Sequence, residues 1–173
     1  ITNRLVGSEM CIRDRSEEDP NSFRVPQTHQ RYWLIDPLDG TKEFINKNDE
    51  FTCNLALINS HQTMYGFVSV PVLGLLYYGG DHHGAYRINR AGGKTRIRCR
   101  RQSTATRVIA SKSHLNPETT AFIEAMETPV ELMQAGSSLK FLRIAEGLAD
   151  VYPRLAPTCE SVSYTHLRAH ETV

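Results

Sequence analysis

The rest of this chain can be interpreted from one segment, Tyr32-Trp33-Leu34-Ile35-Asp36-Pro37-Leu38-Asp39-Gly40-Thr41. Its first four residues are apolar and are typical of a buried strand. Asp36 and Asp39 follow at the end of that strand, and the carbonyl of Leu38 lies between them. Oxygen atoms of these kinds are the ligands that hard cations such as Mg²⁺ prefer. The segment therefore indicates a divalent-cation site.

Gly40 and Thr41 add features that suit phosphate. Gly40 allows a sharp turn that a side chain would obstruct, and Thr41 supplies a hydroxyl where a short helix over residues 42–45 could begin. Free N–H groups at a helix start attract phosphate. Together with the cation ligands they favour metal-assisted phosphate chemistry. The alternative is an ordinary Pro-Leu-Asp-Gly turn after a strand, and the other motifs weigh against it.

The composition is that of a globular domain. The chain has 173 residues, enough for one domain with a substantial core. A net charge of +1 implies no bulk attraction to nucleic acid or to an anionic membrane, and no apolar run is long enough to span a bilayer. The scattered cysteines indicate neither a zinc site nor a disulfide framework, and favour free or buried thiols in a reducing cytoplasm. They are Cys11, Cys53, Cys99 and Cys159.

Both ends of the chain differ from its middle. Residues 1–15 and 161–173 show neither helical nor strand periodicity. We interpret them as foreign tails derived from translated adaptor sequence, and residues 16–160 as the central part of the domain. His166 and His170 have a spacing that could place two zinc ligands on one helix face, but they fall in such a tail.

The central part predicts an α/β layered domain that is more antiparallel than doubly wound. Period-two patterns predict strands, and two later segments predict helices, with Pro117 in the first turn of one and Gly147 ending the other. After the strand at 32–35, the expected strands are 52–58, 64–70, 75–78, 85–88, 107–110 and 149–152, and the expected helices are 117–127 and 138–146.

An acidic cluster precedes the first motif. Ser16-Glu17-Glu18-Asp19-Pro20 is either a solvated turn or the source of a further carboxylate for the cation. A water deprotonated between that carboxylate and the Thr41 hydroxyl would be a nucleophile.

Three later segments carry groups that suit a phosphate or a ribose. Gly136-Ser137-Ser138-Leu139-Lys140 opens a predicted helix, where the serines are either ordinary N-caps or ligand donors, and Lys140 adds a charge. Ser111-Lys112-Ser113-His114 follows a strand, a common position for ligand contacts. Arg154 could hold a phosphate through its planar guanidinium.

Two other clusters are less specific. Asp81-His82-His83 could bind a metal, but the glycines around it favour a hairpin tip. The run from Arg96 to Arg101 could bind nucleic acid, but its alternation favours a solvated strand face.

Residues 33–45, 50–52 and 54–58 together resemble the inositol monophosphatase superfamily. More narrowly, the chain resembles the bacterial 3'(2'),5'-bisphosphate nucleotidases of the CysQ type. Residues 16–20, 136–141, 145–147 and 152–154 fit that branch, and the resemblance covers about residues 16–160. It implies a sugar-phosphatase-like fold that is truncated at both ends.

The resemblance also implies an activity. The expected reaction is Mg²⁺-dependent hydrolysis of the 3'-phosphate of 3'-phosphoadenosine 5'-phosphate to give AMP, in sulfate assimilation and nucleotide recycling. The expected partner is this small nucleotide and not nucleic acid. The expected location is the cytoplasm, including peripheral association with the inner membrane. The alternatives are an inositol monophosphatase-like sugar phosphatase and a non-catalytic domain that binds Mg²⁺ or a nucleotide.

The family's functional residues map onto this chain as follows. Glu17, Asp36 and the Leu38 carbonyl match the ligands of one Mg²⁺, Asp36 and Asp39 match ligands of a second, and Glu17 and Thr41 match the residues that activate the water. By the same resemblance, Gly40 and Thr41 match residues that contact the scissile phosphate. The residues that fall where the family builds its nucleotide pocket are Ser113, His114, Gly136, Ser137, Ser138, Lys140 and Arg154.

The chain departs from the family at its ends. After Glu160 the family continues with Trp-Asp, whose Asp binds the second metal, whereas Ser161-Val162 stands here. The family's helical segment before Ser16 is also absent. We therefore expect weak activity or none from this polypeptide.

Overall fold

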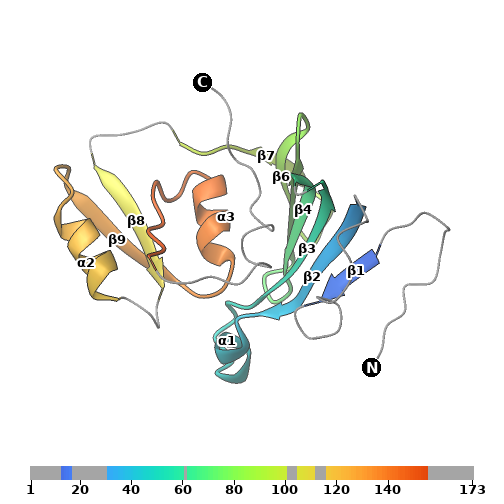
Figure 1. Ribbon diagram of the computed structural model, residues 1–173, viewed down its shortest axis with the longest axis horizontal. Helices are drawn as coiled ribbons and strands as arrows, with labels where there is room; N and C mark the ends of the chain where they lie inside the picture. Colours follow the sequence, from blue (N-terminus) through green and yellow to red (C-terminus); the bar gives the residue numbers. More distant parts are fainter. Residues whose placement is uncertain (1–12, 17–30, 61, 101–104, 112–115, 156–173) are drawn as a thin grey trace.

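Within the described residues there are two sheets, and several strands of the larger one bury alternate side chains (Figure 1). The computed structural model describes residues 13–16, 31–60, 62–100, 105–111 and 116–155. Seven strands lie side by side in chain order, antiparallel except for the parallel β1–β2 pair. They are β1 (Arg13–Ser16), β2 (Arg31–Asp39), β3 (Thr52–Asn59), β4 (Gln62–Val70), β5 (Leu75–Gly80), β6 (Gly84–Ile88) and β7 (Lys94–Ile97). This order confirms the mixed, largely antiparallel fold class.

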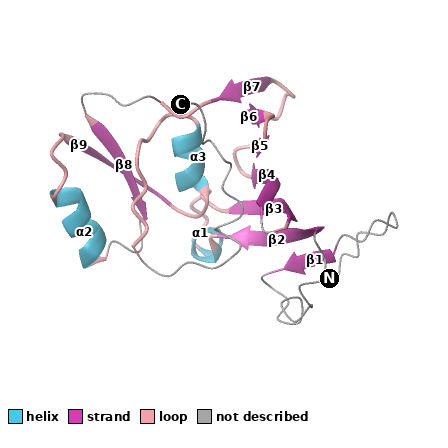
Figure 2. Ribbon diagram, turned by 45° about the horizontal axis from the view of Figure 1, so that its top comes forward, coloured by secondary structure: helices cyan, strands magenta, loops and turns pink. Residues whose placement is uncertain are grey.

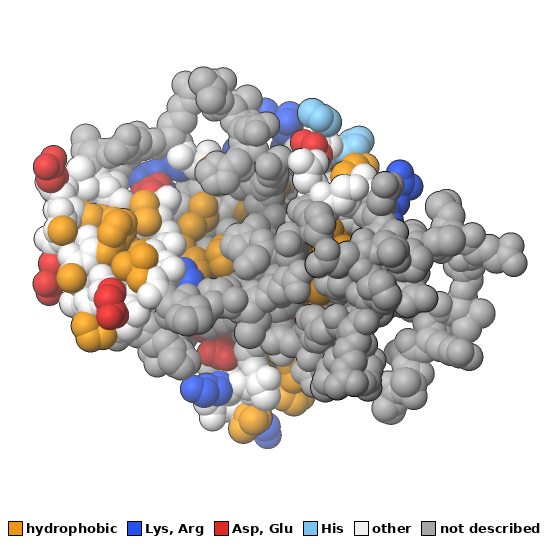
Figure 3. All heavy atoms as spheres, viewed as in Figure 1, with side chains coloured by type: hydrophobic (Ala, Val, Ile, Leu, Met, Phe, Trp, Pro, Cys, Tyr) orange, Lys and Arg blue, Asp and Glu red, His pale blue; other side chains and the backbone are white. Residues whose placement is uncertain are grey.

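The smaller sheet belongs to a βαβ unit in the second half of the chain. Strand β8 (Thr106–Ser111) pairs in parallel with β9 (Val130–Ala135), and α2 (Pro117–Glu124) connects them. Helix α3 (Leu139–Ala145) follows and lies between the two sheets, whereas α2 lies on the far side of β8 and β9 (Figures 1 and 2). Figure 3 shows apolar side chains at the surface over α2, where Phe122 is exposed.

The main hydrophobic core joins both sheets through α3. Val70 and Tyr77 from the larger sheet, Ile109 from β8, and Leu139 and Leu142 from α3 are all buried in one cluster. Helix α3 therefore fixes the position of the smaller sheet against the larger one, because it contributes side chains to the only layer that both sheets share among the described residues.

A second buried cluster lies near the start of β2 and ends at the polar site. Tyr32 and Leu34 of β2 pack with Ala56 and Ile58 of β3. Because side chains alternate along a strand, the same face continues to Asp36 on β2 and to Thr52 and Asn54 on β3, all of which are buried. One face of the sheet thus changes from apolar to polar at its end.

Several predicted boundaries are corrected. Helix α2 ends at Glu124 and not at residue 127, and Asn116 caps its start by accepting from the Thr119 N–H at 3.0 Å. In place of a strand over 149–152 there is a single bridge between Val151 and Val108. Strand β9 was not predicted.

Strand β1 was not predicted either. Arg13–Ser16 pairs with residues 32–35 of β2, although residues 13–15 fall in the segment interpreted as a foreign tail. The origin of both tails stays a prediction.

No helix in the described part of the chain is long and apolar enough to cross a membrane.

Candidate active site

A β-bulge brings the two carboxylates of the first motif to one face of the sheet. Asp36 pairs with Asn54 and Asp39 pairs with Thr52, so three residue steps on β2 oppose two on β3. Without this extra residue, side chains three positions apart would point to opposite faces. With it, Asp36 and Asp39 share the face that carries Thr52 and Asn54. Asp36 is only 4% exposed, so the face is buried at this point.

Asp39 is held by three neutral donors. Its Oδ2 accepts hydrogen bonds from Thr52 Oγ1 at 3.3 Å, from Asn54 Nδ2 at 3.3 Å and from Ser138 Oγ. Asn54 Nδ2 also donates to Ser138 Oγ at 2.9 Å. Because Ser138 lies just before α3, these hydrogen bonds connect the larger sheet to the second half of the chain.

Gly40 lies directly against the turn that precedes α3. It adopts φ +93°, a left-handed conformation that favours glycine, at the start of α1 (Thr41–Ile45). A Cβ atom built at Gly40 would lie 3.0 Å from the Cβ of Ser137. Thr41 is exposed at the first position of α1. The first motif and the Gly136–Ser138 motif are therefore neighbours in space.

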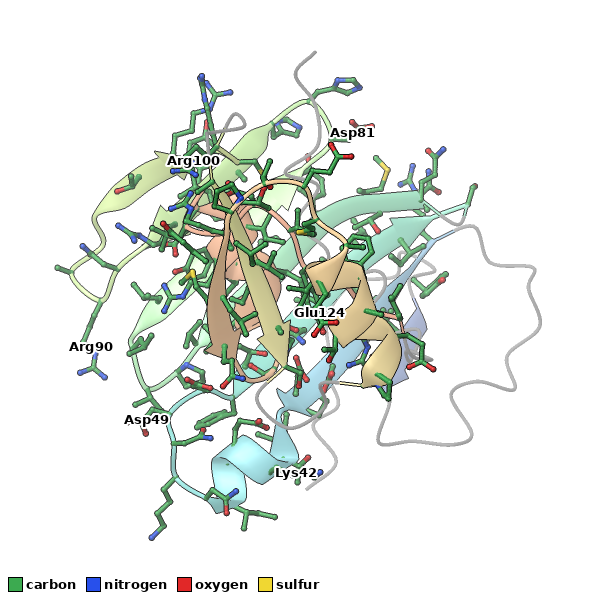
Figure 4. All side chains as sticks on the ribbon, turned by 90° about the vertical axis from the view of Figure 1, so that its left-hand side faces the viewer. Lys42, Asp49, Asp81, Arg90, Arg100 and Glu124 are labelled. Atoms are coloured by element: carbon green, nitrogen blue, oxygen red, sulfur yellow. The ribbon has the colours of Figure 1, made fainter. Side chains whose placement is uncertain are left out.

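The loop after α1 is hydrogen-bonded to this turn. Gly136 N–H donates to Glu50 Oε2 at 2.8 Å, and Ser137 Oγ donates to the Glu50 carbonyl. Lys42 on α1 and Asp49 in the loop lie at the outer edge of the molecule (Figure 4) and are exposed. Glu50 is thus the residue of this loop that connects the two motifs.

Lys140 is buried beside the site. Its Nζ donates to the Ser137 carbonyl at 2.6 Å and to the Ala135 carbonyl at 3.5 Å, and lies 5.6 Å from the centroid of the Tyr152 ring. Burial lowers the pKa of the Lys140 amine, although the negative charge of Asp39 opposes the shift. Burial also raises the pKa of Tyr152, against the influence of Arg154, which hydrogen-bonds to it. Arg154 itself is exposed.

Three predicted site residues lie outside the described residues: Glu17, Ser113 and His114. Their roles stay predictions, as does the zinc alternative for His166 and His170. Within the described residues, no three His, Cys, Asp or Glu side chains form a group that could hold a metal. The described part of the predicted cation site is therefore Asp36, Asp39 and the backbone at Leu38, whose N–H donates to Asp36 Oδ1 at 3.3 Å.

Sequence reasoning did not identify Glu50, Thr52 or Asn54 as parts of the site. Thr52 and Asn54 carry a usable signal, because they are polar residues on the face of β3 that is otherwise apolar at Ala56 and Ile58. Glu50 belongs to a segment that carries the family resemblance, but its contact with the site could not be predicted, since it is made with a residue 86 positions away.

The two less specific clusters lie at the surface where the structure describes them. Arg96 lies on β7, whereas Arg98 and Arg100 follow the end of that strand, so the expected single strand face is wrong; all three are exposed, and Arg101 lies outside the described residues. Asp81, His82 and His83 form the turn between β5 and β6, as expected for a hairpin tip, and the pale-blue histidines are visible at the surface in Figure 3. His83 stacks on Tyr65 at 5.4 Å between ring centroids.

Cys53 and Cys99 are free thiols, and Cys11 and Cys159 lie outside the described residues.

A cleft of about 610 Å³ has Glu50 among its lining residues. Arg107, Met133, Leu139 and Arg143 are among the residues that line it, whereas Asp36 and Asp39 are not. The cleft is therefore separate from the two carboxylates.

Comparison with known proteins gives a consistent result. A 3'(2'),5'-bisphosphate nucleotidase CysQ from Salmonella typhimurium is 43% identical over 143 residues, covering 83% of this chain and 56% of the relative. The protein of the same name from Escherichia coli K12 is 41% identical over 143 residues, which also cover 83% of this chain and 56% of that relative. The chain thus spans about half the length of the curated relatives that it matches.

The fold comparison agrees with the sequence comparison. The crystal structure of CysQ from Bacteroides thetaiotaomicron matches with a TM-score of 0.81 at 35% identity, covering 93% of this chain and 67% of that one. The model of the inositol monophosphatase family matches residues 7–161. Since that match includes the bulged β2 strand, the Gly40 turn and the start of α3, this chain belongs to the inositol monophosphatase family.

Proposed function

We propose that this chain forms the cation-binding and phosphate-binding part of a Mg²⁺-dependent phosphatase. The proposed substrate is 3'-phosphoadenosine 5'-phosphate, and the products are AMP and phosphate. The observation that carries this proposal is the bulge in β2, which gathers Asp36 and Asp39 on one face next to the Gly40 turn. The relatives named as nucleotidases support the choice of substrate.

The residues present fit a hard divalent cation. The candidate ligands are two carboxylates and a peptide carbonyl, all oxygen atoms, and the Asp39 carboxylate contacts uncharged donors. We assign Glu17, Asp36 and the Leu38 carbonyl to one Mg²⁺, and Asp36 and Asp39 to a second. When bound, Mg²⁺ polarises a phosphoryl oxygen and lowers the pKa of a coordinated water.

The chain's own groups would then bind and orient the substrate. Gly40 and Thr41 contribute backbone N–H groups and a hydroxyl for the scissile phosphate. The Glu17 carboxylate would accept a proton from the attacking water, and the Thr41 hydroxyl would orient that water by a hydrogen bond. Lys140 and Arg154 supply positive charge near the Asp39 carboxylate and Tyr152, which suits a substrate with two phosphates.

Two alternatives have specific support. The family model favours an inositol monophosphatase-like sugar phosphatase. The Ser161-Val162 pair, which stands where the family has Trp-Asp, favours a domain that binds Mg²⁺ or the nucleotide without hydrolysing it.

A phosphate-release assay on the purified chain distinguishes these three. We expect slow, Mg²⁺-dependent release from 3'-phosphoadenosine 5'-phosphate, less from inositol 1-phosphate, and none from AMP, the matched control that lacks the 3'-phosphate. Faster release from the inositol ester would select the sugar phosphatase. Calorimetric binding of the nucleotide without any release would select the non-catalytic domain.

A further inference from the structure

The two oxygens of the Asp39 carboxylate have different surroundings. All three of its hydrogen bonds, from Thr52, Asn54 and Ser138, converge on Oδ2. Among the described residues, no hydrogen bond reaches Oδ1. A carboxylate oxygen offers two lone-pair directions, so three donors use the hydrogen-bonding capacity of Oδ2 fully. Oδ1 is the oxygen that remains for another partner.

Ser138 has no hydrogen-bond donor left for a phosphate or a ribose oxygen. It is 2% exposed, its hydroxyl donates to Asp39, and the same oxygen accepts from Asn54 Nδ2 at 2.9 Å. Asn54 and Thr52 are at most 1% exposed. The donors of these three buried side chains are therefore used within the cluster, whereas Asn54 Oδ1 accepts no hydrogen bond from the described residues.

We propose that Ser138, together with Asn54, is a positioning residue for Asp39. By holding Oδ2, it fixes the carboxylate in one orientation, so that Oδ1 alone faces the cation. This role differs from the substrate contact that the family resemblance implies for Ser138, and it rests on the proposed function. It also means that the start of α3, 99 positions away, sets the geometry of a cation ligand on β2.

Cation affinity tests the role. We expect Ser138→Ala to weaken Mg²⁺ binding, measured by calorimetry on the full chain, by about tenfold or more, as is typical when a partner of a metal ligand is lost. Ser138→Cys keeps most of the volume but weakens the donor, so it should behave like the alanine variant. Ser69→Ala, on the half-buried face of β4, is the matched control and should retain the original affinity. Full affinity in either Ser138 variant would overturn the proposal.

A cation-free measurement separates this inference from the proposed function. In a double-mutant cycle with chelator present, Ser138→Ala and Asp39→Ala should each lower Tm, and the double variant should lower it by less than the sum. Additive shifts would overturn the contact whether or not Mg²⁺ binds. If the unmodified chain bound no Mg²⁺ while the shifts stayed non-additive, the proposed function would fail and the positioning of Asp39 would stand.

Discussion

Asp36 and Asp39 differ in how they are held, although both carry carboxylates to the same face. Asp36 is 4% exposed and accepts from the N–H of Leu38, two residues away. Asp39 depends on side chains from β3 and from the segment before α3. The hydrogen bond from Leu38 to Asp36 is therefore local to the motif, whereas the hydrogen bonds to Asp39 come from distant parts of the chain. The first arrangement can be predicted from the Asp-Pro-Leu-Asp-Gly motif, and the second cannot, because it requires Ser138 to be adjacent.

Asp36→Asn should remove most of the cation affinity. Asp36 is assigned to both Mg²⁺ ions, so the loss of its charge weakens both sites. We expect Mg²⁺ affinity, measured by calorimetry, to fall by more than about tenfold. In a version of the chain extended to the length of its relatives, we expect hydrolysis of 3'-phosphoadenosine 5'-phosphate to be abolished. Ser137→Ala should cost much less, since its hydroxyl contacts the Glu50 carbonyl. Equal and mild losses in both variants would contradict the assignment.

Gly40→Ala should destabilise the fold and displace the turn before α3. A side chain at φ +93° costs about 1–3 kcal/mol, and the new Cβ would lie 3.0 Å from the Cβ of Ser137. Gly92→Ala is the matched control, because Gly92 has φ +82° but nothing within 4 Å of an added Cβ. Urea unfolding should show a larger loss for Gly40→Ala than for Gly92→Ala. Equal losses would show that the contact with Ser137 has no energetic consequence.

At the scale of elements, periodicity predicted the strands that bury one face and missed those that do not. β3 alternates buried and half-buried residues along its whole length, and its predicted range differs from the observed one by a single residue. β9 shows no such alternation, because most of its side chains are exposed or half-buried. β1 reads Arg-Asp-Arg-Ser, so its pairing with β2 depends on the backbone and leaves no pattern in the sequence.

Helix α3 is also tied to the larger sheet by a buried carboxylate. Glu146, at the end of α3, accepts hydrogen bonds from the Tyr77 hydroxyl at 3.0 Å and from Arg87 Nη1 at 2.7 Å. Its side chain is only 5% exposed. These contacts connect α3 to β5 and β6, and they complement the apolar packing of Leu142 against the same sheet.

Tyr77 should make the fold sensitive to alkaline pH. Burial, followed by the charge of Glu146 and the hydrogen bond to it, raises the pKa of Tyr77 to about 12. A folded-state pKa above the unfolded value of 10.0 stabilises the fold fully below pH 10, and this stabilisation is lost as the pH rises toward 12. We expect Tyr77→Phe to reduce the loss of unfolding free energy between pH 10 and 12 in urea titrations. If Tyr77→Phe lost as much unfolding free energy between pH 10 and 12 as the unmodified chain, ionisation of Tyr77 would not be the cause of that loss.

At the scale of the whole molecule, the candidate site lies where the two halves of the chain meet. The larger sheet supplies Asp36 and Asp39, and the segment after β9 supplies Gly136 and Ser138. The residues that make these contacts are 86 to 99 positions apart. The family resemblance could place both segments in one site, but hydrophobic periodicity alone could not, because it carries no information on how the two sheets face each other.

A second junction between the halves depends on Asp150. This carboxylate accepts from the backbone N–H of Arg107 at 2.8 Å and from Arg100 Nη2 at 3.2 Å. Arg100 follows β7 (Figure 4), so Asp150 links the end of the larger sheet to β8. Burial raises the pKa of Asp150, but the hydrogen bonds and charges of the two arginines outweigh it, and the net shift is downward from 3.8.

Asp150 should therefore make the fold sensitive to acid. A carboxyl with a lowered folded-state pKa stabilises the fold above the unfolded value, near pH 3.8, and this stabilisation is lost as the pH falls below it. We expect Asp150→Asn to cost about 1–3 kcal/mol of unfolding free energy at pH 7, and to differ less from the unmodified chain at pH 3. Asp49→Asn, an exposed position in the loop after α1, should match the unmodified chain at both pH values. If Asp150→Asn lost the same free energy at pH 3 as at pH 7, the charge of Asp150 would not be what joins β7 to β8, since below pH 3.8 the unfolded chain takes up a proton at Asp150 and the charge then stabilises the fold less.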